Sequence, residues 1–312
     1  MSKYRSLFIK SVIFILLIIG TDIVAGHLMR SLEMKTLEHS PFAMIPEYTM
    51  WKVNTDIVVI GASEAQHSYI PGIIEKRLGK TVYNCGNDGS RFYYQNTMIH
   101  GILKRYTPEL IIWSISPQEL CSPSSEDKDR LSRLNTFYNE DEFCKKALST
   151  KSKYEPLKLK SESYVFNSRL LTYLYKLFTA DYPYEKGAYA PLYGTDKGLE
   201  IKNRSWSNSY DKEIANVFEE TIKACKEKGA GIVIVFTPRF EKEEHENLTS
   251  YKKIKEILQK YDTPLIEDLY HHPSLMKASL FKDHGHMNND GATIFNEMLC
   301  DKLDHIFQPR PQ

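Results

Sequence analysis

A serine, an aspartate and a histidine in two distant stretches of this chain could together perform acyl transfer. Ser63 follows the apolar run 57–60, and small residues at positions 61 and 62 allow a tight turn before it. Asp283 and His286 lie about 220 residues downstream, three positions apart. A histidine that takes a proton from a serine must be held in one tautomer by an acceptor on its other ring nitrogen. Asp283 can be that acceptor, so the pattern predicts a nucleophilic serine with its base.

The same residues allow other interpretations. A serine after a strand is also a common helix N-cap. Asp283, His284 and His286 could bind a metal, as in a metal-dependent phosphoesterase, but their spacing is not one of the usual zinc patterns. The five cysteines include no Cys-x-x-Cys pair, so we expect no metal and no cofactor. A disulfide between Cys121 and Cys144 is an alternative to isolated buried thiols.

Five apolar runs predict the strands of a sheet. They are 57–60, 81–84, 108–115, 232–236 and 263–269. Segments with apolar residues at helical spacing occur between and after them, at 70–79, 93–106, 212–228, 250–260 and 291–306. Strand–helix–strand units imply right-handed crossovers between parallel strands. The order predicts an α/β fold, a doubly wound, mostly parallel five-stranded sheet flanked by helices in a three-layer sandwich. Ser63 would then lie at the carboxyl edge of the sheet, where such folds bind ligands.

The N-terminus predicts a membrane anchor. Lys3, Arg5 and Lys10 flank the start of an apolar stretch, about 7–26, which could just cross a bilayer. No clean small-x-small cleavage site follows, so a signal anchor is favoured over a cleaved signal peptide. The positive residues would stay inside, which places the remainder of the chain on the periplasmic or extracellular side.

Composition and rhythm suggest how the rest of the chain is organised. A net charge of +1, without a basic stripe interleaved with aromatics, excludes a nucleic-acid groove binder. The alternation of predicted strands and helices is interrupted between about 121 and 210. One helix is expected there at 168–179 and a Tyr-rich loop at 181–194. Aromatic residues there, Trp206 included, could line a groove for a sugar-like ligand or pack on the domain. The predicted domains are an anchor at 1–28, a stalk at 29–50, and an α/β domain at 51–312 interrupted by an insertion at about 121–210.

Four motifs, taken in order, resemble the SGNH or GDSL-like hydrolase superfamily. They are Gly61-Ala62-Ser63, the segment 84–89 (Asn-Cys-Gly-Asn-Asp-Gly), a polar turn at 116–119, and Asp283-His284-Gly285-His286. The resemblance covers about residues 53–120 and 212–307, and it implies the flavodoxin-like sandwich that this superfamily adopts.

The resemblance implies roles for individual residues. Ser63 would be the nucleophile, His286 its base and Asp283 the residue that orients His286. The oxyanion hole would use the N–H of Ser63, the N–H of Gly89 and an Asn after the third strand, where Gln118 is the only nearby amide.

Further residues of these motifs are second choices or departures. Gly86 is the second choice for the oxyanion glycine, with Asn87 and His284 as additional site residues. The chain has Ala62 in place of the usual Asp, and no Gly-x-Asn-Asp follows Ile115. The loss of one oxyanion donor can lower a rate by roughly 10²–10³-fold.

These motifs lead us to expect a serine esterase or O-acyltransferase that acts on O-acylated, in particular O-acetylated, cell-envelope carbohydrate. Such a substrate follows from the predicted export and the aromatic segment. A membrane acyltransferase is a candidate partner, and the anchor would hold the protein to the membrane. The alternative is a catalytically weak or inactive SGNH-fold protein that binds glycan or a partner.

Overall fold

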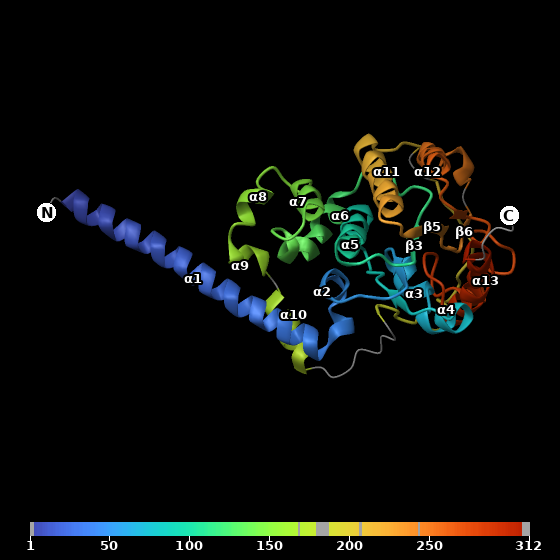
Figure 1. The fold of residues 1–312 in the computed structure, drawn as a ribbon, viewed down its shortest axis with the longest axis horizontal. Helices are drawn as coiled ribbons and strands as arrows, with labels where there is room; N and C mark the ends of the chain where they lie inside the picture. Colours follow the sequence, from blue (N-terminus) through green and yellow to red (C-terminus); the bar gives the residue numbers. More distant parts are fainter. Residues whose placement is uncertain (1–2, 168, 179–186, 206–207, 243, 308–312) are drawn as a thin grey trace. The chain divides into compact units, whose positions relative to one another are not determined.

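The computed structural model describes residues 3–167, 169–178, 187–205, 208–242 and 244–307. The chain forms two compact units, each assembled from two stretches of sequence. Unit 1 comprises Met1–Met44 and Ser132–Tyr182, and unit 2 comprises Ile45–Leu131 and Pro183–Gln312. Figure 1 follows the chain through both units.

Unit 2 is built on a five-stranded parallel sheet with the order β2-β1-β3-β5-β7. Its strands are β1 (Ile57–Ile60), β2 (Val82–Asn84), β3 (Leu110–Ile115), β5 (Gly231–Phe236) and β7 (Leu265–Ile266). Ile57 of β1 lies opposite Val82 on one side and Leu110 on the other. A second, two-stranded sheet pairs β4 (Lys202–Asn203) with β6 (Glu241–Lys242). The predicted α/β fold and all five predicted strands are confirmed.

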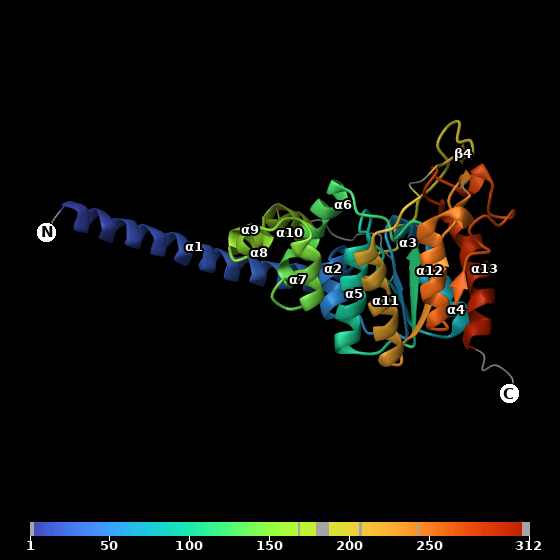
Figure 2. The ribbon, with the colours of Figure 1, turned by 90° about the horizontal axis from the view of Figure 1, so that it is seen from above.

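Helices cover both faces of the five-stranded sheet (Figure 2). One face is covered by α5 (Phe92–Arg105) and α11 (Lys212–Glu227), where Phe92 and Phe218 pack around Trp113 of β3. The other face is covered by α4 (Pro71–Leu78) and α13 (Asn289–Phe307). The apolar residues of the first three strands are buried on both faces, as is typical of a parallel sheet between two helical layers.

The sequence explains where these helices begin and end. Pro71 occupies the first turn of α4, and the helix stops at Gly79, whose φ of 65° suits glycine. The side chain of Asp211 caps α11 by accepting hydrogen bonds from two backbone N–H groups. The remaining helices of unit 2 are α2 (Ile45–Trp51), α3 (Ser63–Ser68), α6 (Ser125–Arg130) and α12 (Thr249–Lys260). Short 3₁₀ turns occupy Pro41–Ala43, Leu131–Phe137, His245–Asn247 and Ala278–Leu280.

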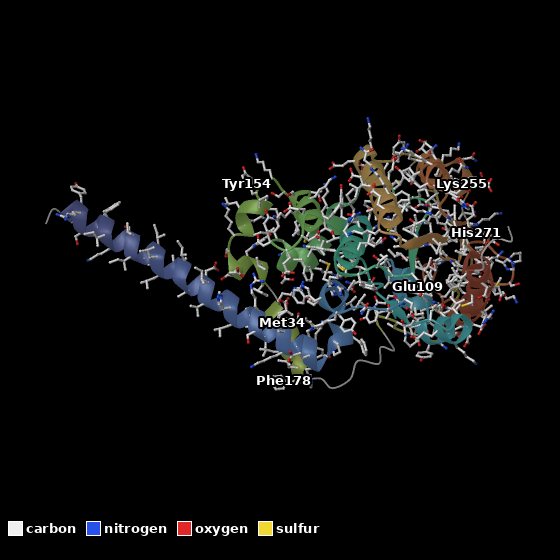
Figure 3. All side chains as sticks on the ribbon, in the orientation of Figure 1. Met34, Glu109, Tyr154, Phe178, Lys255 and His271 are labelled. Carbon is white, nitrogen blue, oxygen red and sulfur yellow. The ribbon has the colours of Figure 1, made fainter. Side chains whose placement is uncertain are left out.

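Unit 1 is helical. It contains α1 (Lys3–His39), α7 (Glu142–Ser149), α8 (Glu155–Lys158), α9 (Glu162–Val165) and α10 (Arg169–Phe178). By length and composition α1 could cross a membrane, and its most apolar part is exposed. The C-terminal half of α1 packs within unit 1, where the Tyr173 hydroxyl donates a 2.7 Å hydrogen bond to buried Glu33. Tyr154, the residue before α8, and Phe178, the last residue of α10, are exposed and are labelled in Figure 3.

The two units divide the chain differently from the predicted domains. The helix α1 continues to His39, through much of the expected stalk at 29–50, and 45–50 belong to α2 in unit 2. Of the expected insertion, 132–182 group with α1, while 121–131 and 183–210 belong to unit 2. The predicted helix 168–179 is observed as α10. Trp206 and the first part of the Tyr-rich loop lie outside the described residues.

Candidate active site

Ser63 begins α3, directly after the carboxyl end of β1. The turn between them requires Gly61, because a side chain there would lie 2.6 Å from the Cβ of Ala65 and 3.0 Å from the carbonyl oxygen of Ser114. Ser63 itself is partly exposed. The hydroxyl of the first residue of α3 is therefore presented at the edge of the sheet, where the sequence predicted it.

The structure brings together the three residues predicted as a triad. The Oγ of Ser63 lies 2.8 Å from Nε2 of His286. On the other side of the ring, Nδ1 of His286 lies 3.0 Å from each carboxylate oxygen of Asp283. With the proton on Nδ1 donated to Asp283, Nε2 is free to accept the serine proton, which is the arrangement that a general base requires.

The loop that carries Asp283 and His286 is held by its own backbone. Asp283 accepts hydrogen bonds from the backbone N–H of Gly285 at 2.7 Å and of His286 at 3.0 Å. An antiparallel bridge between Phe281 and Met287 closes the loop. Burial alone would raise the pKa of Asp283, but the hydrogen bonds and charge of the His286 ring, with those two N–H groups, outweigh it and lower the pKa. Asp283 is therefore an ionised acceptor in a fixed position.

The loop after β2 buttresses the serine turn. The side chain of Asn84 donates to the carbonyl oxygens of Ala65 and Tyr69 at 2.8 Å each, and its own oxygen accepts from the N–H of Gly86. The N–H of Asn87 donates to Gly61 at 3.2 Å. Gly86 and Asn87, predicted as additional site residues, thus hold the backbone around Ser63 in place.

A cavity of about 170 Å³ lies beside Ser63. Gly89 and Gln118, the two predicted oxyanion residues, both line this cavity together with Ser63. Gly89 has a φ of 63°, a conformation that suits glycine. Gln118 is buried in the turn after β3. The cavity also holds five charged side chains that the sequence did not single out: Glu64, Arg91, Glu119, Arg204 and Arg239.

A network of ion pairs borders Ser63. Glu64 accepts a hydrogen bond from Arg239, and its other oxygen lies 3.3 Å from the Oγ of Ser63. Arg239 also contacts buried Glu241, which in turn binds Arg204. Burial would raise the pKa of Glu64, but the charge of Arg239, reinforced by a backbone N–H and by the charges of His286 and Arg91, lowers it. The one sequence signal for Glu64 is its position next to Ser63.

A second histidine, also missed from the sequence, lies next to His286. His67 is one turn along α3 from Ser63, and its ring meets that of His286 edge-on at a centroid distance of 5.4 Å. Its Nδ1 lies 2.6 Å from the carbonyl oxygen of Ala190. Burial lowers the pKa of His67, and the proximity of His286 adds to this effect. His67 is therefore held as a neutral ring against the ring of His286.

The structure separates His284 from the other two residues of the hypothetical metal site. Its Nε2 lies 3.0 Å from the carbonyl oxygen of Glu200, whereas Asp283 and His286 bind each other. Among the described residues, no group of three His, Cys, Asp or Glu side chains is arranged to hold a metal ion. All five cysteines are free thiols in the structure, and the disulfide between Cys121 and Cys144 stays a prediction.

Known proteins resemble this chain only in structure. No family profile matches the sequence, and no curated protein sequence matches it either. Solved structures with a similar fold include an acetyl xylan esterase (TM-score 0.39, 11% identity, covering 81% of this chain and 99% of the other). A GDSL-like lipase from Bacteroides thetaiotaomicron has a TM-score of 0.39 and 10% identity, with 85% and 100% covered. An SGNH-hydrolase family esterase has a TM-score of 0.31 and 12% identity, with 81% and 96% covered. The chain is similar to SGNH- and GDSL-like esterases and lipases, the superfamily that its motifs resemble.

Proposed function

We propose that this protein is a serine esterase or O-acyltransferase in which Ser63 is the nucleophile, His286 the general base and Asp283 the residue that orients the base. The observation that supports the proposal most is the continuous series of contacts from Ser63 Oγ to His286 Nε2, at 2.8 Å, and from His286 Nδ1 to Asp283, at 3.0 Å. Serine, imidazole and carboxylate in this order are the elements of acyl transfer on many unrelated folds.

The chemistry follows from this order. Ser63 attacks the ester carbonyl while His286 takes its proton, and the protonated ring then gives that proton to the leaving alcohol. Water or a sugar hydroxyl next attacks the acyl-enzyme and restores the serine. Asp283 stabilises the imidazolium form of His286 in both steps.

The lining of the cavity supports a short acyl group on a polar carrier. Five charged side chains border a volume of about 170 Å³, which suits an acetyl ester of a carbohydrate better than a long acyl chain. We propose an O-acetylated glycan of the cell envelope as the substrate, with the protein anchored by α1 and its catalytic unit on the exported side. A membrane acyltransferase that supplies or receives the acyl group is the proposed partner.

Kinetics of the full-length protein in detergent test this proposal. We expect hydrolysis of p-nitrophenyl acetate and acetate release from an O-acetylated polysaccharide. Ser63→Ala should reduce both to background, and Asp283→Asn should lower kcat by about 10³–10⁴-fold because the base loses its preferred tautomer. A Ser63→Ala variant as active as the wild type would disprove the proposal.

A second candidate function is a binding protein with little catalysis. It is favoured by the turn after β3, which offers Gln118 instead of an Asn, and by the Glu64 carboxylate beside the serine hydroxyl. A fluorophosphonate probe separates the two functions. Labelling of the wild type but not of Ser63→Ala supports an active nucleophile, and an unlabelled wild type supports the binding protein.

A further inference from the structure

Three arginines line the cavity beside Ser63, and two of them are already paired. Arg204 donates from Nη1 to both carboxylate oxygens of Glu241, at 2.7 and 2.9 Å. Arg239 contacts Glu64 and, through Nε at 3.1 Å, the same Glu241. Part of each guanidinium is therefore already bound to carboxylates of the protein.

Arg91 differs from both. It lies two residues after Gly89, immediately before α5, and it is exposed. The negative charges of Glu119, Asp127 and Glu64 act on it, Glu119 most strongly. Within the described part of the chain, however, its guanidinium forms no ion pair with them. A guanidinium carries five N–H donors and stays charged at any working pH, so Arg91 can donate to a ligand in the cavity.

Glu119 lies in the segment after β3, where the resemblance to the superfamily implies an Asn of the oxyanion hole. It is four residues beyond the end of β3, only 5% exposed, and it lines the same cavity as Arg91. One of its oxygens accepts from the N–H and hydroxyl of Ser116, at 3.4 and 3.2 Å. The other oxygen is buried and accepts no hydrogen bond from the described residues. Of the charges that act on Arg91, that of Glu119 is the strongest, so Glu119 is the carboxylate that can orient the guanidinium.

We propose that Arg91 is a further catalytic residue that supplies the oxyanion donor missing after β3, and that Glu119 is its positioning residue. The inference rests on the proposed role of Ser63. As the Oγ of Ser63 bonds to the carbonyl carbon, the π electrons of that carbonyl move to its oxygen and the serine proton moves to His286. The oxyanion then accepts hydrogen bonds from the N–H groups of Ser63 and Gly89 and from the Arg91 guanidinium. When the carbonyl re-forms, the bond to the alcohol breaks and His286 returns the proton to that alcohol.

The test uses full-length variants and the neutral ester p-nitrophenyl acetate, so that loss of a positive charge does not alter attraction of the substrate. Arg91→Ala should lower kcat by about 10²–10³-fold with KM changed by less than about threefold, because the interaction is made in the transition state. Arg91→Lys keeps the charge but not the planar guanidinium. Its kcat should lie between those of Arg91→Ala and the wild type. Free guanidinium ion, added well below denaturing concentrations, should restore part of the activity of Arg91→Ala and none of Ser63→Ala.

Arg77→Ala is the matched control, since Arg77 is a surface arginine of α4 paired with Glu297 and Asp301. It should keep the wild-type kcat. Glu119→Gln should lower kcat less than Arg91→Ala does and leave KM unchanged, because Arg91 remains but is less well oriented.

Two results would overturn the inference without touching the proposed function, provided that Ser63→Ala is inactive. One is a kcat for Arg91→Ala within about threefold of the wild type, together with a loss of 10²-fold or more in Gln118→Ala, which would make Gln118 the donor. The other is a loss in Arg91→Ala that tracks a fall in melting temperature and does not respond to guanidinium. An active Ser63→Ala, by contrast, would overturn the proposed function itself.

Discussion

The hydroxyl of Ser63 has one proton and two acceptors within reach. His286 Nε2 lies 2.8 Å from its Oγ and Glu64 Oε2 lies 3.3 Å from it. The shorter contact favours the base, and Arg239 holds the other oxygen of Glu64. In the proposed reaction this ion pair matters, because an unbalanced negative charge beside Ser63 would oppose an oxyanion forming there. Arg239 offsets that charge.

The Glu64–Arg239 pair gives the stability of unit 2 a defined pH dependence. The folded state lowers the pKa of Glu64 below its ordinary value of 4.5, so the pair contributes its full stability above pH 4.5 and loses it as the pH falls through the lowered pKa. Glu64→Gln should therefore lower the free energy of unfolding by about 1–3 kcal/mol at pH 7. The difference from the wild type should shrink as the pH falls below 4.5.

Urea unfolding at pH 7, 5 and 3 measures this difference directly. Asp262→Asn is a suitable control, since Asp262 lies in the turn after α12 and is separate from the cavity lining. A Glu64→Gln variant as stable as the wild type at pH 7 would show that the ion pair does not stabilise the fold.

The sequence revealed the three triad candidates but not the charges around them. Ser63 ends an apolar run at a small-residue turn, and Asp283 and His286 are near neighbours in one loop, so each has a local signature. Glu64 and Arg239 are 175 residues apart and belong to the ends of different strand–helix units. The local sequence around Glu64 gives no indication of Arg239, nor the reverse. The two residues come together only because β1 and β5 assemble into the same sheet.

At the scale of elements, α3 is positioned by the strand next to it. The buried side chain of Asn84 donates hydrogen bonds to one carbonyl group in α3, that of Ala65, and to one at its C-cap, that of Tyr69. These bonds connect the helix that begins at Ser63 to the end of β2. Gly86 lies so close to this helix that a side chain would contact the backbone N of Gln66 and lie 2.8 Å from the carbonyl carbon of Ala65. Gly86 does not have a positive φ, so its backbone conformation does not require glycine. The close packing against α3 does.

Gly86→Ala should consequently disturb both stability and catalysis. A methyl group there would overlap the backbone of α3 at Ala65 and Gln66, so the helix that begins at Ser63 or the loop after β2 must shift, and overpacking of this kind costs about 1–3 kcal/mol. We expect a lower urea midpoint and a kcat reduced by at least tenfold, since small misplacements of a nucleophile are costly. Gly72→Ala in α4 is the matched control, because nothing lies within 4 Å of its added methyl group. An unchanged kcat in Gly86→Ala would mean that α3 tolerates the shift.

The five strands of the main sheet and the helices α4, α5, α11, α12 and α13 were predictable because each carries its own periodicity. Ile57 to Ile60 are all β-branched, and α11 has an apolar stripe ending in glycines. The fifth strand is shorter than the predicted 263–269. Pro264 has no N–H to donate to a ladder, and the residues after Ile266 turn away, so pairing is limited to Leu265 and Ile266.

At the scale of the whole chain, unit 1 could not be predicted, because it joins segments more than 100 residues apart. The sequence predicted a stalk at 29–50 after the anchor, and it assigned no contacts to the polar residues Asp22 and Arg30. In the structure they are contact residues. Asp22 accepts hydrogen bonds from the hydroxyl of Ser161 and the N–H groups of Glu162 and Ser163, and Arg30 pairs with Glu162 at 3.0 Å. Residues 22–37 are therefore part of a folded unit as well as the continuation of an apolar helix.

This dual role predicts that α1 remains on the mature protein. Cleavage near residue 26 would remove Asp22, the acceptor at the start of α9, and would expose the surface that Gly26 covers against Glu162. We expect the full-length protein to stay in the membrane fraction after carbonate extraction. We also expect the tryptic peptide 11–30 to be found by mass spectrometry in the purified C-terminally tagged protein.

Asp22→Asn, which keeps an acceptor but loses the charge, should weaken unit 1 less than Asp22→Leu does, as judged by protease resistance of residues 132–167. A mature N-terminus beyond residue 26, with unit 1 still protease-resistant, would contradict this prediction and identify the apolar stretch as a cleaved signal.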